Sequence, residues 1–458
     1  MHDRREKTIC AVSTAPGAGG IAVIRVSGPK ALEIVRKISK KFNLSTFKPE
    51  SHKCYFTEII DPRTNQVIDE GLITYFANGK SFTGEEVLEI SCHGSPYITQ
   101  KIIESLIYSG CVMADKGEFT FRAFMNGKLD LIQAEAVLST IQANSEASAK
   151  VAFRQLEGHV SRKYQSIESD LTWCLAHIEA SIDFSTEGID VVDQNVLTQK
   201  IKNVQSRLIE IQKGYLSGKQ AKNGIKIVLV GKPNAGKSSL LNLLLQEDKA
   251  IVTSIAGTTR DVIESETFYG GLKFQISDTA GLRDTQDEVE KIGVNRSLQE
   301  AEKADLLIQV VDASEPETDL KIDVKSHIGL IIFNKIDLKP VNQDEIREKL
   351  HEKFKTPVLF ISCLDPKTRE VVLNTSKDLI GDMSYLSEAV ISTTRQYECN
   401  KYALEMIDTT LMELEKNLGS EFVAMYLKES LISIQRILGI SYDDQILDRV
   451  FKEFCLGK

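Results

Sequence analysis

A glycine-rich segment in the middle of the chain combines residue types that bind phosphate. Residues 231–238 have the sequence Gly-Lys-Pro-Asn-Ala-Gly-Lys-Ser and match the pattern G-x-x-x-x-G-K-S. Glycines let the backbone wrap closely around a phosphate, while loop amides and a following helix N-terminus supply positive partial charge. We expect Lys237 to reach the β- and γ-phosphates of a nucleotide and the Ser238 hydroxyl to ligate Mg²⁺. The expected contact segment is Asn234, Ala235, Gly236, Lys237, Ser238 and Ser239.

Two shorter motifs each follow an apolar run, as expected for loops at the ends of buried strands. In Asp278-Thr279-Ala280-Gly281, the Asp would hold Mg²⁺ through water and the Gly would sense a γ-phosphate. In Asn334-Lys335-Ile336-Asp337, the last carboxylate could accept hydrogen bonds from N1–H and the exocyclic amine of guanine. Adenine lacks that pair of donors, so the motifs together predict GTP rather than ATP. Ser362 and Cys363 fit a weaker fifth motif beside the base.

A polar segment between the first two motifs is expected to be a mobile loop. It consists of Thr253, Ser254, Ile255, Ala256, Gly257, Thr258 and Thr259. Thr258 and Thr259 are candidates to complete the Mg²⁺ coordination while a γ-phosphate is present. Leu282 stands where Ras-like enzymes carry a water-orienting glutamine, and leucine cannot orient water by hydrogen bonding. Hydrolysis must then be slow or depend on another acid and another cation, for which the candidates are Asp287, Glu288, Glu290, Arg260 and Arg283.

The three motifs require a sheet whose strand ends meet at one edge. Short apolar runs alternate with helix-like segments across residues 225–380, and these runs are 225–230, 274–277, 306–311, 330–333 and 358–361. Alternation of this kind predicts parallel strands in a doubly wound α/β sheet.

The two ends of the chain have different patterns from the centre. Short β-branched runs and two helix-like segments predict a small α/β domain near the N-terminus, with strands at 21–26, 72–76 and 87–91 and helices at 30–40 and 97–108. Helical periodicity in proline-free stretches predicts packed helices at about 129–160, 196–216 and 398–438.

These patterns predict an α/β plus all-α protein of three domains. The N-terminal domain would span 1–125, a helical domain would combine 126–222 with 382–458, and a Ras-like P-loop GTPase domain would be inserted at 223–381. Three or four consecutive independent domains are the alternative.

Composition limits the class of protein further. The chain has 458 residues, 42% of them hydrophobic and 26% charged, which is the balance of a globular protein with several domains. Its net charge of -9 argues against a broad nonspecific nucleic-acid surface. The eight cysteines form no C-x-x-C pair, so neither a zinc site nor a disulfide framework is indicated. No secretory signal and no apolar stretch long enough to span a bilayer is found, so the cytoplasm is the expected location.

The motifs in combination resemble those of the MnmE family, also called TrmE. The resemblance rests on GKPNAGKSSLLN, IAGTTRD, DTAGLR and DEVEKIG in the centre, on GAGGIAVIRVSG, SFTGEEVLE, HG and GEFTFRAFMNGKLDL towards the N-terminus, and on FCLGK at the end. It covers essentially the whole chain, and other GTPases share the central motifs but not the two ends. It implies an N-terminal tetrahydrofolate-binding and dimerising domain, a helical domain and an inserted GTPase domain.

The resemblance also implies an activity. Members are homodimeric, K⁺-activated GTPases that work with MnmG (GidA), an FAD protein, in a heterotetramer. Together they form a (carboxymethyl)aminomethyl group at C5 of the wobble uridine of certain tRNAs, using 5,10-methylenetetrahydrofolate or 5-formyltetrahydrofolate. The K⁺ lies where an arginine finger would, and it stabilises charge that develops in the transition state.

The same resemblance assigns roles to individual residues. The Asn234 side chain and oxygens of Thr253, Ile255 and Thr258 would bind K⁺, and Thr259 would bind Mg²⁺ together with Ser238. Glu290 would orient the attacking water. The residues assigned to folate are Arg25, Glu89, Lys128 and Lys458. From the residues alone, Arg25, Glu89 and Lys128 could equally be an ordinary strand residue, a surface charge and a helix-start cation.

Cys455 has three interpretations. A cysteine fourth from the end suggests prenylation, but Gly457 and Lys458 fit that pattern poorly. The others are a buried structural thiol and, as the resemblance implies, a catalytic thiol near Lys458. Two positions depart from the family pattern: Ser254 replaces an acid, and Ser362-Cys363 replaces Ser-Ala. These departures bear on affinity and base contacts.

Two other functions compete with the one that the resemblance implies. A GTP-switched assembly factor, for example of the ribosome, would usually carry an RNA-binding domain, and neither a KH-type G-x-x-G in a basic context nor a basic tail is present. A membrane-remodelling GTPase would need a basic amphipathic helix or a lipidation motif.

Overall fold

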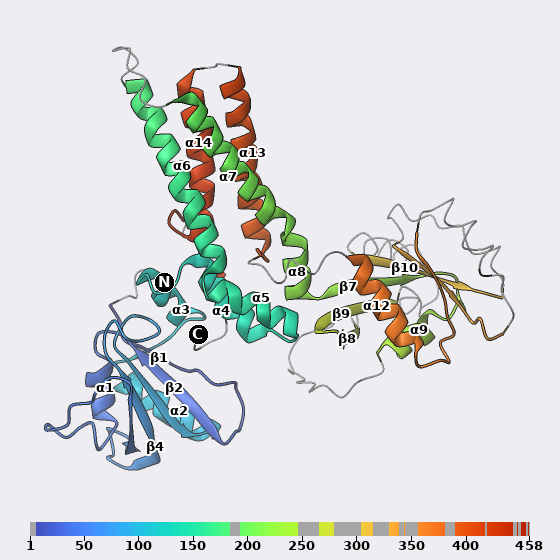
Figure 1. Cartoon of the computed structure of the whole chain (residues 1–458). Helices are drawn as coiled ribbons and strands as arrows, with labels where there is room; N and C mark the ends of the chain where they lie inside the picture. The colour runs from blue at the N-terminus through green and yellow to red at the C-terminus, as the bar shows by residue number, and fades with distance from the viewer. Residues whose placement is uncertain are drawn as a thin grey trace, which may run out of the picture. The chain divides into compact units, whose positions relative to one another are not determined.

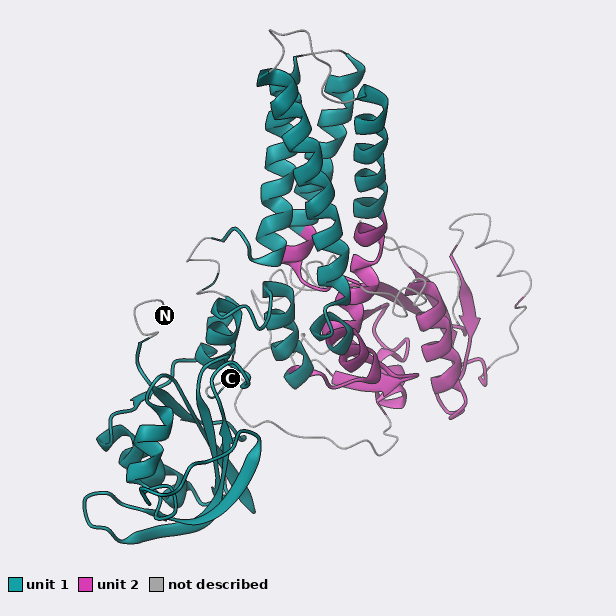
Figure 2. Ribbon diagram, turned by 60° about the vertical axis from the view of Figure 1, so that its left-hand side comes forward, with its two compact units in different colours: residues 1–141, 153–209, 398–458 teal, residues 142–152, 210–397 magenta. Residues whose placement is uncertain are grey.

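The computed structural model (Figure 1) describes most of the chain. The described residues are 6–183, 193–245, 265–278, 304–314, 329–338, 343, 356–380, 390–416, 419–442, 447, 450–454 and 457. They form two compact units, one of residues 1–141, 153–209 and 398–458 and the other of residues 142–152 and 210–397 (Figure 2). Within these ranges, none of the helices combines the length and the apolar character needed to cross a membrane.

The N-terminal part of the first unit is a six-stranded sheet. Its strands in spatial order are β3 (Lys53–Ile60), β4 (Val67–Phe76), β5 (Val87–His93), β2 (Ile21–Ser27), β1 (Ile9–Val12) and β6 (Val112–Met113). Alternate residues of the central strands, such as Ile24 and Ile90, are fully buried in one core with helices α1 (Ala31–Lys37) and α2 (Pro96–Tyr108). Because side chains alternate between the two faces of a strand, Arg25 and Glu89 lie on the opposite face.

Long helices make up the rest of this unit, some of them extending into the other. They are α3 (Glu118–Met125), α4 (Leu131–Gln142), α5 (Glu146–Leu156), α6 (His159–Asp183), α7 (Gln194–Lys213), α13 (Thr394–Glu415) and α14 (Ser420–Leu438). The Tyr164 hydroxyl donates to Asn400 Oδ1 at 3.0 Å, and Asn400 Nδ2 donates to the Leu208 carbonyl at 3.1 Å. These buried bonds join helices from before and after the central part of the chain, so the helical domain is built from two chain segments.

The second unit contains another six-stranded sheet. Its spatial order is β12 (Val358–Phe360), β11 (Leu330–Asn334), β10 (Leu306–Asp312), β7 (Ile225–Val230), β9 (Leu272–Asp278) and β8 (Ser265–Tyr269). All neighbours are parallel except β8, which pairs with β9 in an antiparallel hairpin. Helices α9 (Lys237–Leu244) and α12 (Thr368–Ile380) share one apolar core with β7 and β9, and α8 (Tyr215–Asn223) leads into β7.

The predicted fold class is confirmed, and several elements differ in detail. All five apolar runs form the expected parallel strands, and β7 lies between β10 and β9 in the interior of the sheet. Strands β1, β3, β6 and β8 were not predicted. The helical run predicted at about 129–160 is divided into α4, α5 and the start of α6; the second break contains Gly158, whose φ of 78° is left-handed.

Candidate functional site

The phosphate loop follows β7 in the centre of the parallel sheet. Gly231 has a φ of 149°, and a Cβ there would lie 2.2 Å from the Val310 carbonyl oxygen of the neighbouring strand. Gly236 begins α9 with a left-handed φ of 95°. Lys237 is only 5% exposed, and its ammonium donates to the Gly231 and Lys232 carbonyls at 2.8 and 2.7 Å. The loop therefore folds around a cation, at the start of a helix whose free amides favour an anion.

Two oxygen ligands suited to Mg²⁺ lie together beside the loop. The Ser238 hydroxyl in the first turn of α9 donates to Asp278 Oδ2 at the end of β9, with a distance of 2.9 Å. A hydroxyl and a carboxylate are hard donors of the kind that Mg²⁺ binds beside phosphates. The strands β7 and β9 are parallel neighbours, and this arrangement brings the two motifs to the same edge of the sheet.

The expected guanine motif contacts the phosphate loop directly. Asn334 is 2% exposed; its Nδ2 donates to the Ala235 carbonyl at 3.1 Å, and its Oδ1 accepts from the Cys363 backbone N–H at 3.2 Å. One amide side chain thus joins the phosphate loop, β11 and the fifth motif. Asp337 lies three residues later and is exposed, which leaves its carboxylate accessible to a base.

Lys335 makes a second link to the loop, and it also pairs with Asp312, a residue that the sequence analysis missed. Its Nζ donates to the Asn234 carbonyl at 2.7 Å and pairs with Asp312 Oδ2 at 2.7 Å. The Ser314 backbone N–H and hydroxyl donate to Asp312 Oδ1 at 2.9 and 2.7 Å. Burial alone would raise the pKa of Asp312, but the hydrogen bonds from Lys335 and Ser314 outweigh it and hold that pKa below its usual value.

Sequence signals for Asp312 existed, although they were weak. It ends the buried strand Leu306–Asp312, just as Asp278 ends β9, so a polar residue at the same sheet edge was predictable. The left-handed φ angles of Asn234 and Lys335, both 65°, mark the two backbone turns that the hydrogen bond from Lys335 Nζ to the Asn234 carbonyl connects.

The atypical fifth motif keeps its backbone contact. Cys363 is half-buried against the core of the second unit, and burial raises the pKa of its thiol to about 11. The thiol is therefore neutral and apolar at physiological pH, and it substitutes for a small apolar side chain. The Ser362 carbonyl accepts from the Thr368 hydroxyl at 2.8 Å, which fixes the turn into α12.

Several predicted residues lie outside the described ranges. They are Ser254, Ala256, Gly257, Thr253, Ile255, Thr258 and Thr259 of the loop, Thr279, Ala280 and Gly281 after β9, the candidate cations Arg260 and Arg283, the candidate acids Asp287, Glu288 and Glu290, and Cys455 and Lys458 near the C-terminus. Their expected roles remain predictions.

A second polar site lies on the N-terminal sheet. Arg25 of β2 and Glu89 of β5 are directly opposite each other, and Arg25 Nη2 and Nε lie 2.8 and 2.9 Å from Glu89 Oε1. The guanidinium carbon is 5.5 Å from the Phe82 ring centroid and 5.6 Å from that of Phe119. Two aromatic rings and a carboxylate therefore hold one cation in a fixed orientation. The rings were not predicted, because Phe82 lies in the loop before β5 and Phe119 on α3, and only the tertiary packing brings them to Arg25.

Hydrogen bonds within the first unit position Lys128 and residue 457 near the end of the chain. Lys128 Nζ donates to the Gly79 carbonyl at 3.1 Å, and its Cγ would be 3.2 Å from a Cβ at Gly84. At the other end, the Ser13 hydroxyl donates to the Gly457 carbonyl at 3.1 Å. The end of β1 leads directly into Ser13, and β1 pairs with the strand of Arg25. Residue 457 is thus held beside the sheet that carries Arg25.

Gly457→Ala is expected to displace the end of the chain from β1. Gly457 has a φ of 90°, and a Cβ there would lie 2.2 Å from the Val12 carbonyl oxygen. The family resemblance assigns Lys458, the next residue, to folate. If that assignment is right, the substitution should weaken binding of 5-formyltetrahydrofolate about tenfold, measured by calorimetry. Gly17→Ala is the control: its φ is 123°, with no atom within 4 Å of the added Cβ. Equal affinities of Gly457→Ala and wild type for this folate would show that the contact between Gly457 and β1 does not contribute to its binding.

The fold and the geometry of the second unit define a class of protein. A parallel sheet carries a phosphate loop, a Ser–Asp oxygen pair and a guanine-type Asn-Lys-x-Asp loop at the carboxyl ends of β7, β9 and β11. Those features together are the nucleotide site of P-loop GTPases.

Comparisons with known proteins identify the family. The model described as GTP-binding protein TrmE N-terminus matches residues 8–128, and that of the MnmE helical domain matches residues 131–455. The tRNA modification GTPase MnmE of Bdellovibrio bacteriovorus is 47% identical and covers 100% of this chain and 98% of its own length. That of Alkaliphilus oremlandii is 38% identical, and that of Flavobacterium johnsoniae 37%, each covering 99% of both chains. The chain belongs to the MnmE family of tRNA modification GTPases.

Proposed function

We propose that this protein couples K⁺-activated GTP hydrolysis to modification of the wobble uridine of certain tRNAs. In this proposal an FAD-dependent partner of the MnmG type supplies the redox chemistry, and a one-carbon tetrahydrofolate supplies the carbon. The product is a (carboxymethyl)aminomethyl group at C5. Family membership over the full chain is the observation that carries the proposal. The two polar sites, one on each sheet, support it.

The nucleotide loop fits the cations that the proposal requires. Ser238 and Asp278 offer Mg²⁺ two oxygens, and Thr259 would complete that set. Asn234 has a left-handed φ of 65° and its carbonyl is held by Lys335, so its position in the loop is fixed. Its amide oxygen, with oxygens of Thr253, Ile255 and Thr258, would hold K⁺ beside the β- and γ-phosphates. A bound K⁺ would stabilise transition-state charge without a catalytic arginine, and Glu290 would orient the attacking water.

The proposal extends to the organisation of the molecule. We propose that residues 1–125 bind folate and form a homodimer, that 126–222 and 382–458 form the helical domain, and that 223–381 form the GTPase domain. Two copies with two MnmG-type partners would form a heterotetramer in the cytoplasm. Folate would bind near Arg25, Glu89 and Lys128, with Lys458 and Cys455 contributed by the C-terminal residues. In cells, deletion should abolish the wobble modification and leave ribosome profiles unchanged, because modification and not ribosome assembly is the proposed role.

The K⁺ requirement gives the sharpest test of this proposal. GTP hydrolysis by the full chain should be about 10²-fold faster in K⁺ than in Na⁺ at equal ionic strength, and Asn234→Ala should lose most of that stimulation. Asn374→Ala is the matched control, since Asn374 is an exposed residue of α12 in the same unit. Equal rates in the two salts would contradict K⁺ activation and would favour a GTP switch of another kind.

A further inference from the structure

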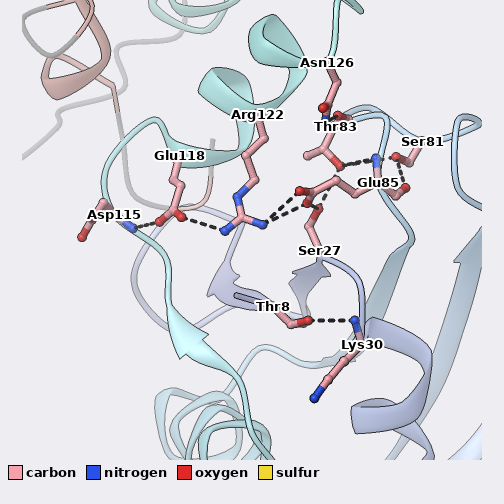
Figure 3. A network of polar contacts seen from close by, with 10 residues as sticks. All are labelled: Thr8, Ser27, Lys30, Ser81, Thr83, Glu85, Asp115, Glu118, Arg122 and Asn126. Carbon is pink, nitrogen blue, oxygen red and sulfur yellow. Dashed lines mark hydrogen bonds and ion pairs between the residues drawn. The ribbon is translucent and has the colours of Figure 1, made fainter. Parts of the chain in front are cut away.

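A buried ionic network, drawn in Figure 3, joins the segments that carry the two aromatic rings beside Arg25. Its centre is Arg122 of α3, whose side chain is 2% exposed. Arg122 Nη1 lies 3.1 and 3.0 Å from the two carboxylate oxygens of Glu85, and Nη2 lies 2.9 Å from Glu118 Oε1. The fork of one guanidinium therefore joins two carboxylates that come from different segments.

Each carboxylate is fixed by further hydrogen bonds. Glu85 Oε2 accepts from the buried Ser27 hydroxyl of β2 at 2.6 Å. Glu118 Oε2 accepts from the Asp115 backbone N–H at 2.8 Å, at the start of α3. The Ser27 hydroxyl also lies 2.8 Å from Thr83 Oγ1. The network thus connects α3, β2 and the segment of residues 81–86.

The two connected segments carry the aromatic rings beside Arg25. Phe82 lies between Thr83 and Ser81, whose hydroxyl donates to the Glu85 carbonyl at 2.6 Å, and Phe119 directly follows Glu118. Phe119 is fully buried, whereas Phe82 is 37% exposed. The separation between these two rings, and so the position of the cation between them, depends on how the 81–86 segment sits against α3.

A second branch of the network leads to the other proposed folate residue. Asn126 Nδ2 donates to the Thr83 carbonyl at 2.7 Å. Lys128 follows two residues later, and its side chain packs beside Gly84. Two of the cations proposed for the folate site, Arg25 and Lys128, are therefore positioned by the same junction between residues 81–86 and α3.

We propose that Arg122 is a positioning residue: through Glu85 and Glu118 it fixes the Phe82–Arg25–Phe119 stack and Lys128 in the arrangement that binds an anionic folate. This inference rests on the proposed function, since it concerns the same ligand site. Arg122 itself is too deeply buried to contact a ligand.

A purely stabilising role would not account for this choice of residues. Burying a guanidinium and two carboxylates requires their desolvation, and buried ion triads replaced by neutral residues of similar volume often give equally stable proteins. What neutral residues do not reproduce is the fixed fork geometry that sets distance and direction between two segments. Orientation of the neighbouring stack is therefore the property that the charged triad provides.

The test separates stability from positioning with three variants of the full chain. Arg122→Met leaves two carboxylates without their cation and should lower the melting temperature. The triple variant Arg122→Met/Glu85→Gln/Glu118→Gln removes all three charges and should regain most of the melting temperature that Arg122→Met loses. Arg122→Lys keeps the charge without the fork. We expect the triple and Lys variants to bind 5-formyltetrahydrofolate at least about tenfold more weakly than wild type, by calorimetry, while GTP hydrolysis is unchanged.

Arg63→Met is the matched control, because Arg63 pairs with Asp61 at the surface, in the turn between β3 and β4. Wild-type affinity in a well-folded triple variant would overturn the positioning role. Amide hydrogen exchange of residues 79–86, measured without ligand, distinguishes the two proposals. If wild type fails to bind folate but these amides exchange faster in the triple variant than in wild type, the folate assignment is wrong, whereas the positioning of this segment by Arg122 is supported. Unchanged exchange would overturn the positioning as well.

Discussion

Asp337→Asn is expected to change the base preference of the protein from guanine to xanthine. Asp337 is exposed at the end of a turn in which the Leu338 N–H donates to the Lys335 carbonyl at 3.1 Å. A carboxylate there can accept from both N1–H and the C2 amine of guanine. An asparagine would face that amine with its own NH₂ donors, yet it could donate to the C2 carbonyl of xanthine. Rejection of a base that leaves polar groups unpaired reaches on the order of 10⁴-fold.

The measurement is competition of GTP and XTP for the same site, together with hydrolysis of each. The variant should bind XTP with an affinity near that of wild type for GTP, because the phosphate loop is unchanged. Asp378→Asn, at an exposed position of α12, controls for the loss of one negative charge in this unit. Retention of GTP preference by Asp337→Asn would mean that another residue recognises the base.

The parallel sheet could be predicted because its signals are local. Each buried strand is a short apolar run, and phosphate binding requires glycines at fixed places in one loop. β7 accordingly lies where its apolar run predicted, and a helix, α9, follows the phosphate loop as the motif requires. The antiparallel strand β8 carries no such run, since its five residues Ser265–Tyr269 are mixed and depend on pairing with β9.

The N-terminal site could not be derived from sequence spacing. Arg25 and Glu89 are 64 positions apart and meet only through the register of β2 with β5. Phe82 and Phe119 reach the guanidinium through tertiary packing, and Ser13 reaches Gly457 across 444 positions. Family resemblance indicated Arg25 and Glu89, whereas the surrounding rings required the structure. Non-local contacts of this kind leave no periodic trace along the chain.

The contact between Gly236 and Asn334 combines a local sequence signal with a non-local contact. It also predicts a large effect of Gly236→Ala on GTP binding. Glycine at position 236 is a local signal that the phosphate motif specifies. Its close approach to Asn334 is not local: an added Cβ would lie 2.1 Å from Asn334 Nδ2. The phosphate motif and the guanine motif are therefore in steric contact, so a larger side chain in one motif should displace the other.

Gly236→Ala should accordingly weaken GTP binding by about 10³-fold in a fluorescent-nucleotide titration. The left-handed φ of 95° costs an alanine about 1–2 kcal/mol, and loss of the buried Asn334–Ala235 bond costs about 1–3 kcal/mol more. Gly270→Ala provides the control, since its φ is also left-handed at 57° but the nearest atom is the flexible end of Lys377 at 3.4 Å. That control should lose little affinity. If both variants bind GTP equally well, the contact with Asn334 does not hold the loop. If only Gly236→Ala fails while its melting temperature is close to that of the control, the two motifs act as one rigid nucleotide site.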